Sequence, residues 1–302
     1  MQLFNTVMAH AITWVPRALV QKISRRYIAG ESLDDAVGRI RQLNSLGFKV
    51  TIDVLGETVS SIQQTENTAD EYRRVLNAIQ DHGLKASISV KPTALGLLLD
   101  TQHCEQLLGK IVTIAERHQT LVCMDMEDVS CTQKEIDLFA NLASGHTNIS
   151  LALQAYLQRT YQDLDSLLLT RSSLRICKGI YLEDRSHLVD KAWNDRSEIN
   201  PHFMNHIARC FEMGTFVGVA THDIALIDQV IELARSRDID KTMFEFQMLL
   251  GVCEPLQCKL LGMGFSVRIY VPYGKDWYAY SMRRMKENPQ IAGYILQALM
   301  SR

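Results

Sequence analysis

Eight short apolar segments alternate with helical patterns along most of the 302-residue chain. Their β-branched and aromatic residues are typical of buried strands. They lie at 48–55, 86–90, 121–126, 149–155, 174–177, 216–221, 243–249 and 265–271. Helical patterns between them include 70–80, 105–117, 134–142 and 223–235, and an earlier helix is expected after Ser32, an N-cap residue before an acidic turn. Because each return between strands needs a crossover, the strands should be parallel. Eight is the number that closes a (β/α)8 TIM-like barrel, and the chain length fits that fold.

An open doubly wound sheet is the competing architecture for this alternation. Such a sheet usually carries a glycine-rich phosphate-binding turn after an early strand. The first strand ends instead in DVLGE at 53–57, and neither a GxGxxG motif nor a P-loop occurs in the chain. We therefore expect one barrel domain at 29–302, preceded by an N-terminal helical segment at 1–28.

Charge and cysteine content narrow the functional classes. The net charge of -2 and the pI near 6.5 give no bulk electrostatic reason to expect nucleic-acid binding. The seven cysteines are an odd number without a CxxC motif, and no secretory signal is recognisable, which favours reduced thiols in a cytoplasmic protein. No run of 18 apolar residues suggests a membrane span.

The N-terminal segment mixes apolar and basic side chains. Pro16 interrupts residues 1–26, so they can form two short helices at most. An amphipathic basic segment of this kind can lie on a membrane surface. The commoner alternative is a helix that packs on the body of the protein.

Polar residues stand at the carboxyl end of every expected strand, where barrel enzymes carry their chemistry. They are Asp53, Lys91, Asp125 with Glu127 and Asp128, Gln154, Arg175 with Lys178, Thr221 to Asp223, Glu245 with Gln247, and Tyr270. Charged groups within buried strands are costly unless they are paired or used. Eight such strand ends predict a functional site. Alternatively, Glu245 and Gln247 bond within the barrel interior, and His222-Asp223 caps the following helix.

The stretch RIYVPYGKDWYAYSMRRMKE at 268–287 predicts a strand that breaks at Pro272, followed by a helix with Asp276 as its N-cap. On that helix Tyr280, Arg283, Arg284 and Glu287 lie three or four residues apart and share one face. Paired guanidinium groups suit a carboxylate ligand, although the face could simply be solvated.

A metal site is not expected. His202 and His206 have the i, i+4 spacing of a metal-binding pair, but no third ligand or intervening glutamate accompanies them.

The motifs at the strand ends resemble, in order, those of the flavin-dependent proline dehydrogenases, from Tyr27 to about Asn288. The matching segments are YIAGE at 27–31, DVLGE at 53–57, SVKPTALG at 89–96, DMED at 125–128, QAY at 154–156, RICKGIY at 175–181, ATHD at 220–223, FEFQML at 244–249 and the YxxRR helix at 280–284. The resemblance implies a distorted (β/α)8 barrel whose last helix lies over the mouth. It also implies FAD bound without a Rossmann turn.

The resemblance assigns roles to individual residues. Asp125 and Arg175 match the catalytic positions, with Arg175 near the flavin N5, where a cation stabilises the charge of the reduced ring. The residues that would bind the substrate, L-proline, are Lys91, Tyr181, Leu249, Tyr270, Tyr280, Arg283, Arg284 and Glu287. The residues that would contact FAD are Met126, Gln154, Lys178, Gly179, Ile180, Thr221, His222 and Gln247.

The implied reaction is hydride transfer from L-proline to flavin N5, giving Δ1-pyrroline-5-carboxylate, with a quinone as electron acceptor. This implies a cytoplasmic protein with peripheral contact to the inner face of the membrane. Pro92 and Ile180 depart from the family pattern and bear on the fit of the substrate, whereas Tyr270 favours proline over hydroxyproline.

Three other functions are compatible with parts of the pattern. A Schiff-base aldolase or lyase would use Lys91 or Lys178 as its nucleophile. A barrel that only binds a carboxylate metabolite would show no turnover. A nicotinamide-dependent dehydrogenase would reduce added NAD without a bound chromophore. None of the three explains the YxxRR helix together with the ordered motifs.

Overall fold

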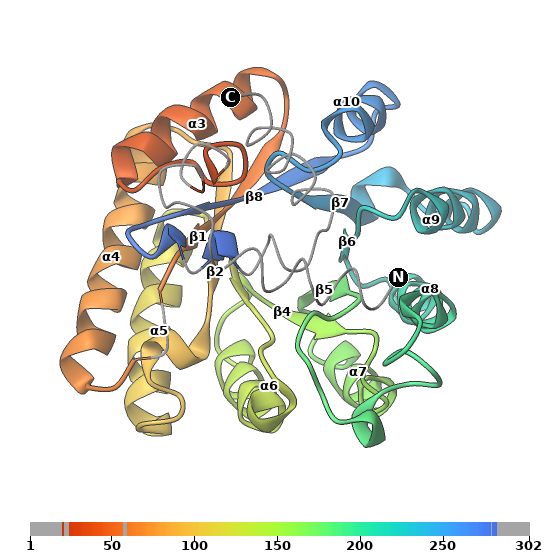
Figure 1. The fold of residues 1–302 in the computed structure, drawn as a ribbon, viewed down its shortest axis with the longest axis horizontal. Coiled ribbons are helices and arrows are strands. Elements are labelled where there is room, and N and C mark those ends of the chain that lie inside the picture. The colour runs from red at the N-terminus through yellow and green to blue at the C-terminus, as the bar shows by residue number, and fades with distance from the viewer. Residues whose placement is uncertain (1–19, 21–23, 57–58, 279, 283–302) are drawn as a thin grey trace.

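The computed structural model describes residues 20, 24–56, 59–278 and 280–282. Eight parallel strands close into a barrel in chain order, each pairing with the next and β8 pairing with β1. The strands are β1 (Lys49–Val54), β2 (Ala86–Val90), β3 (Val122–Met124), β4 (Ile149–Gln154), β5 (Ser173–Cys177), β6 (Val217–Ala220), β7 (Phe244–Leu249) and β8 (Val267–Tyr273). Figure 1 shows the strands at the centre and the helices around them. The predicted strands and the (β/α)8 fold are confirmed.

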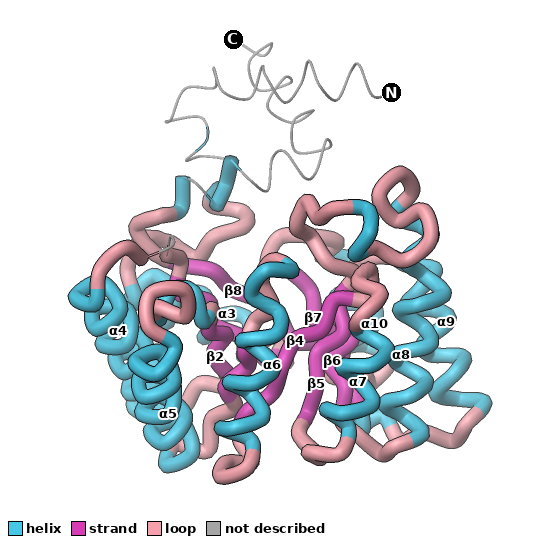
Figure 2. The backbone as a smooth tube through the Cα atoms, turned by 90° about the horizontal axis from the view of Figure 1, so that it is seen from below, coloured by secondary structure: helices cyan, strands magenta, loops and turns pink. Residues whose placement is uncertain are grey.

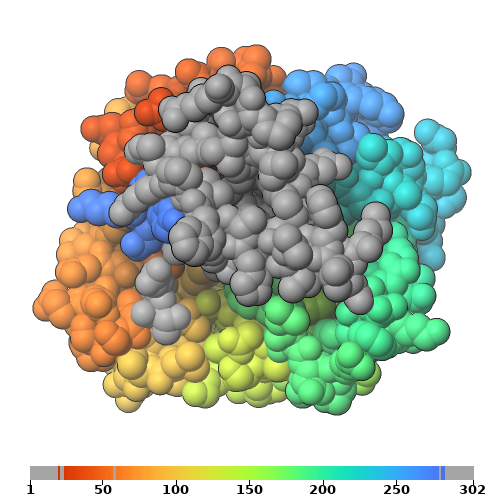
Figure 3. Space-filling model, viewed as in Figure 1, coloured from red at the N-terminus to blue at the C-terminus, as the bar shows by residue number. Residues whose placement is uncertain are grey.

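Helices form the outer layer. They are α3 (Leu33–Ser45), α4 (Ile62–Asp81), α5 (Thr101–Arg117), α6 (Val129–Ala143), α7 (Thr160–Leu168), α8 (Asn200–Glu212), α9 (Ile224–Ser236) and α10 (Glu254–Gly262). In the space-filling view, the colours of these helices follow one another around the rim in chain order (Figure 3). Each crossover therefore covers its own sector of the barrel.

Helix starts are set by polar caps. The predicted start after Ser32 is confirmed, since the Ser32 hydroxyl accepts from Asp35 N at 3.2 Å and the Asp35 carboxylate accepts from Ser32 N at 3.1 Å. Three helices begin earlier than the apolar periodicity predicts, because their first turns are polar. Their N-caps are Ser61 for α4, Asp100 for α5 and Asp128 for α6.

Alternation along each strand separates two environments. In β1, Val50 and Ile52 are at most 1% exposed and belong to the apolar core beneath the helices. Thr51 and Asp53 alternate with them along the strand and point into the barrel, where Thr51 Oγ1 lies 3.0 Å from Ser87 Oγ. The apolar face packs the helices, at about 1.5–3 kcal/mol for each fully buried large side chain. The interior is polar.

The end of β8 differs from the prediction. Pro272 was expected to end the strand, but β8 continues to Tyr273. The last pair between β7 and β8 is Leu249 with Tyr270, so Pro272 lies beyond that ladder and pairs only with Asp53 of β1. A proline lacks an N–H, and it is tolerated where one neighbouring strand has ended. Helical residues follow at 277–278 and 280–282, directly after the predicted N-cap Asp276.

The long loops gather at one end of the barrel, as the side view shows (Figure 2). The longest of these connections joins Cys177 at the end of β5 to Asn200 at the start of α8. Within the described part of the chain, no helix is both long and apolar enough to cross a membrane.

Candidate active site

Asp125 directly follows β3, and its carboxylate accepts hydrogen bonds from several strands. Oδ1 accepts from Ser89 Oγ and from Arg175 Nη1, each at 2.6 Å. Oδ2 accepts from the Tyr270 hydroxyl at 2.7 Å, and Lys91 Nζ lies 3.6 Å from it. The Tyr270 and Asp125 side chains bond although they are 145 residues apart in the sequence, because the barrel is closed. We call these five residues the Asp125 cluster.

Charges within the cluster are paired. Lys91 Nζ also lies 2.5 Å from Asp53 Oδ1, and the Asp53 side chain is 1% exposed. Burial alone would lower the pKa of Lys91, but the carboxylates of Asp53 and Asp125 raise it above its ordinary value. Burial raises the pKa of Asp125, but Lys91 and Arg175 together with the bound hydroxyls hold it below its ordinary value. Together with Asp53, the cluster therefore pairs two basic side chains with two carboxyl groups.

Arg175 is fixed by more than its ion pair. Its Nε donates to Gln247 Oε1 at 2.5 Å, and its guanidinium carbon lies 5.6 Å from the centre of the Tyr270 ring. Gly218 of β6 stands between β5 and β7, and a Cβ there would lie 2.3 Å from Gln247 Nε2. The missing side chain at Gly218 thus gives the Gln247 amide the room to reach Arg175.

Glu245 and Arg268 lie below this cluster, nearer the amino ends of the strands. Arg268 Nε donates to Glu245 Oε1, and Arg268 Nη2 lies 3.2 Å from Glu245 Oε2. Gln247 Nε2 donates to Glu245 Oε1 at 2.9 Å, so this pair is joined to Arg175 through Gln247. Glu245 is 1% exposed. The alternative that Glu245 bonds within the barrel interior is therefore confirmed, and Gln247 also contacts the site.

The ends of β4 to β7 hold several of the residues predicted to contact FAD. Gln154 Nε2 donates to the Glu127 carbonyl oxygen at 2.8 Å. Lys178 Nζ lies 2.8 Å from Asp223 Oδ2. Gly179 adopts φ +101°, where a Cβ would lie 2.3 Å from the Tyr156 ring. These backbone and side-chain groups line the mouth beside the Asp125 cluster.

The residues of the segment Thr221-His222-Asp223 make different contacts. Asp223 caps α9 by accepting from Ala225 N at 3.1 Å, and Asp223 N donates to Thr221 Oγ1 at 3.1 Å. His222 Nε2 accepts from Leu249 N at 2.9 Å. The capping alternative is therefore confirmed for Asp223, whereas the hydrogen bond of His222 connects the ends of β6 and β7.

The other predicted site residues lie around this centre or outside the description. Met126 and Tyr280 are buried, Leu249 and Tyr181 are half-buried, and Ile180 is 40% exposed. The predicted carboxylate clamp, formed by Arg283 and Arg284 with Glu287, lies outside the described residues. Its geometry remains a prediction.

Several bonding partners were missed by sequence reasoning. Ser89 lies two residues before Lys91 and so faces the same side of the strand, which was the available signal. Arg268 lies in the same way two residues before Tyr270. Glu135 is 0% exposed in α6. It lies three and four residues before the buried Leu138 and Phe139, and this helical spacing was the available signal.

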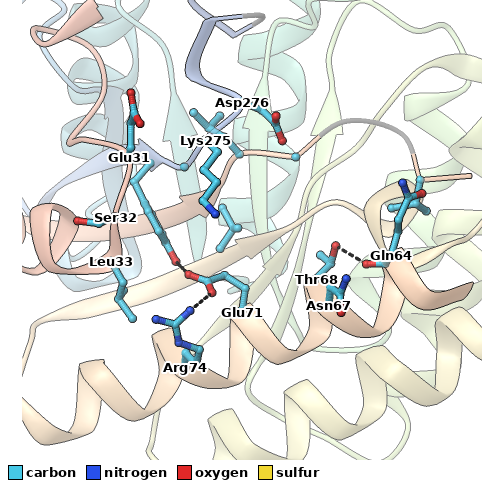
Figure 4. A pocket seen from close by; sticks show the side chains of 16 residues that line it. Glu31, Ser32, Leu33, Gln64, Asn67, Thr68, Glu71, Arg74, Lys275 and Asp276 are labelled. Atoms are coloured by element: carbon cyan, nitrogen blue, oxygen red, sulfur yellow. Dashed lines mark hydrogen bonds and ion pairs between the residues drawn. The ribbon is translucent and has the colours of Figure 1, made fainter. Parts of the chain in front are cut away.

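A separate cavity of about 830 Å³ lies beside α4, the β1–α4 loop and the end of β8. Glu71 of α4 accepts from the Tyr273 hydroxyl at 2.7 Å. Figure 4 shows Glu71 paired with Arg74. None of the described residues predicted for the site lines this cavity. The cavity is therefore distinct from the Asp125 cluster.

His202 and His206 serve other purposes than metal binding. His202 bonds Asp190 Oδ2 at 2.7 Å and the Tyr161 hydroxyl at 2.8 Å. Burial lowers the pKa of His206 to about 4, and its ring lies 4.5 Å from that of Tyr161. Among the described residues, no group of three or more His, Cys, Asp or Glu side chains could hold a metal ion.

Comparisons with known proteins agree on one family. The family model described as proline dehydrogenase matches residues 36–296. Proline dehydrogenase 2 of Bacillus subtilis (strain 168) is 35% identical over 96% of this chain and 93% of its own length. Proline dehydrogenase of Deinococcus radiodurans is 31% identical over 94% of this chain and 92% of its own length.

A solved structure of proline utilization A (PutA) from Bdellovibrio bacteriovorus, inactivated by N-propargylglycine, has a TM-score of 0.80 to this chain. It is 21% identical and covers 87% of this chain and 32% of its own. At that identity it supports the fold alone.

A closed barrel whose mouth gathers buried acidic, basic and phenolic groups defines a (β/α)8-barrel enzyme. The sequence matches carry the assignment further. The chain belongs to the proline dehydrogenase family. It is accordingly a flavin-dependent oxidoreductase of proline catabolism, and the family inferred from the motifs is confirmed.

Proposed function

We propose that the barrel mouth binds FAD and L-proline, that the product is Δ1-pyrroline-5-carboxylate, and that a quinone receives the electrons. The single observation that most supports this is the Asp125 cluster, where a buried carboxylate holds Arg175 and Tyr270 while Lys91 stands beside it. The oxidation removes a hydride from the ring carbon next to nitrogen and a proton from that nitrogen, which leaves a C=N bond. Positioning is therefore the main demand on the protein.

The substrate side of the proposal uses cations and aromatic walls. Lys91 keeps its charge, since the pKa of its ammonium group is raised by Asp53 and Asp125. With Arg283 and Arg284, it would hold the carboxylate of L-proline, while Glu287 would pair with one of the arginines and orient it. Tyr270, Tyr181, Tyr280 and Leu249 would enclose the pyrrolidine ring.

The cofactor side fits the residues at the ends of β4 to β7. Gln154, Lys178 and Gly179 offer an amide, a cation and a closely approachable backbone, while Ile180 is 40% exposed and apolar. Near the Lys178–Asp223 pair, the buried Oδ1 of Asn200 has no hydrogen-bond partner among the described residues. A hydroxyl group of the ribityl chain would satisfy such an acceptor. Met126, Thr221, His222 and Gln247 complete the proposed FAD contacts.

Asp125 and Arg175 are the proposed catalytic residues. When bound, FAD supplies the hydride acceptor and stores the electron pair. The Arg175 guanidinium, held at 2.6 Å from Asp125 Oδ1 and 2.5 Å from Gln247 Oε1, provides a fixed positive charge for the cofactor. Because these bonds already orient the charge, little reorganisation is needed during the reaction.

The ion pairs of the lysines disfavour a Schiff-base mechanism. A nucleophilic lysine must be uncharged, and its pKa is usually depressed by burial or by another cation. Lys91 has two carboxylates nearby and a raised pKa, and Lys178 is paired with Asp223. The two carboxylates stabilise the ammonium form of Lys91, and Lys178 is held in an ion pair rather than left free as a nucleophile.

The proposal also covers the domain bounds, the electron acceptor and the place of the protein in the cell. The catalytic domain would be 29–302, with 1–28 as a separate helical segment. A quinone acceptor would require peripheral contact with the inner face of the membrane by an otherwise cytoplasmic protein. Reduction of a soluble quinone by the proline-loaded protein, with and without vesicles, would measure both points. Turnover with dyes but never with quinones would contradict this acceptor.

Two lysine variants test the division of the mouth into a substrate side and a cofactor side. Lys91→Met should raise the KM for L-proline at least tenfold, the loss expected for a charged hydrogen bond of about 1.5–3 kcal/mol, and leave bound flavin unchanged. Lys178→Met should weaken flavin retention with less effect on KM. Wild-type KM in Lys91→Met, measured with flavin saturating, would remove Lys91 from the substrate site.

A further inference from the structure

Glu127 joins three strand ends of the active site through its own backbone and side chain. Its carboxylate accepts from Thr93 N at 3.0 Å and from Thr93 Oγ1 at 2.6 Å, next to the segment that carries Lys91. Its carbonyl oxygen accepts from Gln154 Nε2 at 2.8 Å. It also lies two residues after Asp125. The position of Glu127 therefore bears on Lys91, Asp125 and Gln154 together.

The backbone N–H of Glu127 is bound by a side chain from the outer layer of helices. Both carboxyl oxygens of Glu135, in α6, lie 3.2 Å from Glu127 N. Glu135 is 0% exposed, and no ion pair of the described residues includes it. A buried N–H without an acceptor is costly, so this carboxyl group fixes the loop between β3 and α6.

The surroundings of Glu135 favour its neutral form. The ionisable groups that face it are Glu127, Asp125 and Asp128 on the β3 side, and the buried thiols of Cys104 and Cys131. None of these groups can carry a positive charge. Burial first, and then the Glu127 carboxylate, raise the pKa of Glu135 to about 9. At neutral pH the side chain is a carboxylic acid.

We propose that Glu135 is a positioning residue for proline oxidation, acting as a neutral acid that holds the Glu127 backbone and thereby the alignment of Asp125, Gln154 and Lys91. It touches neither of the proposed ligands and acts through Glu127. The inference rests on the proposed function for its kinetic readout, but not for its structural one.

The arrangement has a consequence at alkaline pH. Deprotonation of Glu135 places a second anion against the Glu127 carboxylate in a site that is closed to water. Repulsion between the two then displaces the β3–α6 loop. Asp125, Gln154 and Lys91 would then lose their alignment. We expect a lower flavin affinity and a lower kcat/KM as the pH rises through about 9.

Three variants of the full-length holoenzyme separate the possibilities. Glu135→Gln keeps the shape and the acceptor oxygen but cannot ionise. Glu135→Leu removes the acceptor. Asp137→Asn, on the exposed side of the same helix, is the matched control. The measurements are kcat/KM for L-proline from pH 6.5 to 10, the flavin dissociation constant, and the infrared band of a protonated carboxylic acid.

Glu135→Gln should match the wild type at pH 7 and retain activity at alkaline pH where the wild type and Asp137→Asn lose it. Glu135→Leu should weaken flavin binding or kcat/KM about tenfold at pH 7, as for the loss of one buried hydrogen bond. The infrared band should be present in wild type and reduced in Glu135→Gln.

Other outcomes would overturn the proposal. An alkaline fall that is identical in Glu135→Gln and wild type removes the ionisation, and a large loss in Glu135→Gln at pH 7 shows that the charged form is needed. A folded Glu135→Leu that is merely less stable, with unchanged flavin affinity and kcat/KM, leaves Glu135 with no positioning role. If Glu135→Leu does not fold, the pH comparison with Glu135→Gln still decides. Should the protein fail to oxidise proline, the infrared band and flavin binding still test Glu135 separately.

Discussion

The polar pair beneath the active site makes a quantitative prediction about stability. Glu245 is 1% exposed and bonds Arg268 through both carboxylate oxygens, and Lys49 is the only other cation of the described residues paired with it, at 3.5 Å. Arg268 also donates to Val50 O at 2.9 Å and Ser87 Oγ at 3.0 Å. Arg268→Met would leave a buried carboxylate next to a lysine whose side chain is 47% exposed. We expect a loss of about 3–5 kcal/mol in the free energy of unfolding, as for other broken buried pairs.

The pH dependence of this loss provides a second check. Burial raises the pKa of Glu245, but Arg268 outweighs it and holds the pKa below its ordinary value. In wild type, the pair therefore contributes stability above the unfolded-state pKa of a glutamate, and this contribution is lost as the pH falls. Without Arg268, burial of Glu245 costs the most free energy when its carboxylate is ionised. The difference between wild type and Arg268→Met should shrink as the pH falls from 7 toward about 4.

Urea unfolding of the apoprotein at several pH values measures these differences by linear extrapolation. The double variant Glu245→Leu/Arg268→Met should lose less than Arg268→Met alone, because no charge is left buried. Arg235→Met is the control, since Arg235 pairs with Glu232 on the surface with both side chains more than 60% exposed (73% and 68%). It should change stability by less than about 1 kcal/mol. An Arg268→Met loss that is this small, or that does not vary with pH, would show that Arg268 does not stabilise a buried, ionised Glu245.

Changes at the clamp, at Arg175, at the N-terminal segment and at Glu135 should each have a separate effect. Arg283→Met or Arg284→Met should raise the KM for L-proline strongly while flavin stays bound; wild-type KM values in both would eliminate the carboxylate clamp. Arg175→Ala should slow anaerobic flavin reduction by proline in stopped-flow measurements, and an unchanged rate would dismiss its proposed charge role. Deletion of residues 1–19 should leave dye-linked turnover largely intact, whereas loss of folding would make the segment part of the barrel. Relative to Glu135→Gln, the wild type should lose about 1.4 kcal/mol of stability per pH unit between about 5 and 8, because the unfolded glutamate is ionised while the native one keeps its proton; parallel stability curves would show that native Glu135 is ionised.

Much of the barrel could be predicted because its strands have two chemically different faces. Outward residues such as Val50 and Ile52 make the strands recognisable, and inward residues such as Asp53 identify the site. The first residues of the helices were harder to predict from the sequence, because a polar first turn with its N-cap precedes the apolar residues that mark each helix. Pro272 was misjudged because its tolerance depends on where β7 ends, which is set by a distant part of the chain.

Partners of site residues were harder to infer than the residues themselves. The bond from Ser89 to Asp125 spans 36 residues and that from Arg268 to Ser87 spans 181. Spacing along the strand indicates which face each side chain takes, but not the distant residue that it bonds. Glu135 shares the apolar face of α6 with Leu138 and Phe139, so its spacing indicates an inward position, but not that it bonds Glu127 N. Long-range closure of the barrel determines such contacts.

The most direct test of the central claim is a visible spectrum of the purified protein before and after anaerobic addition of L-proline. We expect flavin absorption bands that bleach when proline is added, since the substrate would deliver its hydride to the bound cofactor. Bands that persist with L-proline but bleach with a chemical reductant would contradict the proposed substrate. A protein that stays colourless after reconstitution with FAD would contradict the proposed cofactor, and with it the roles of Arg175 and the strand ends of β4 to β7.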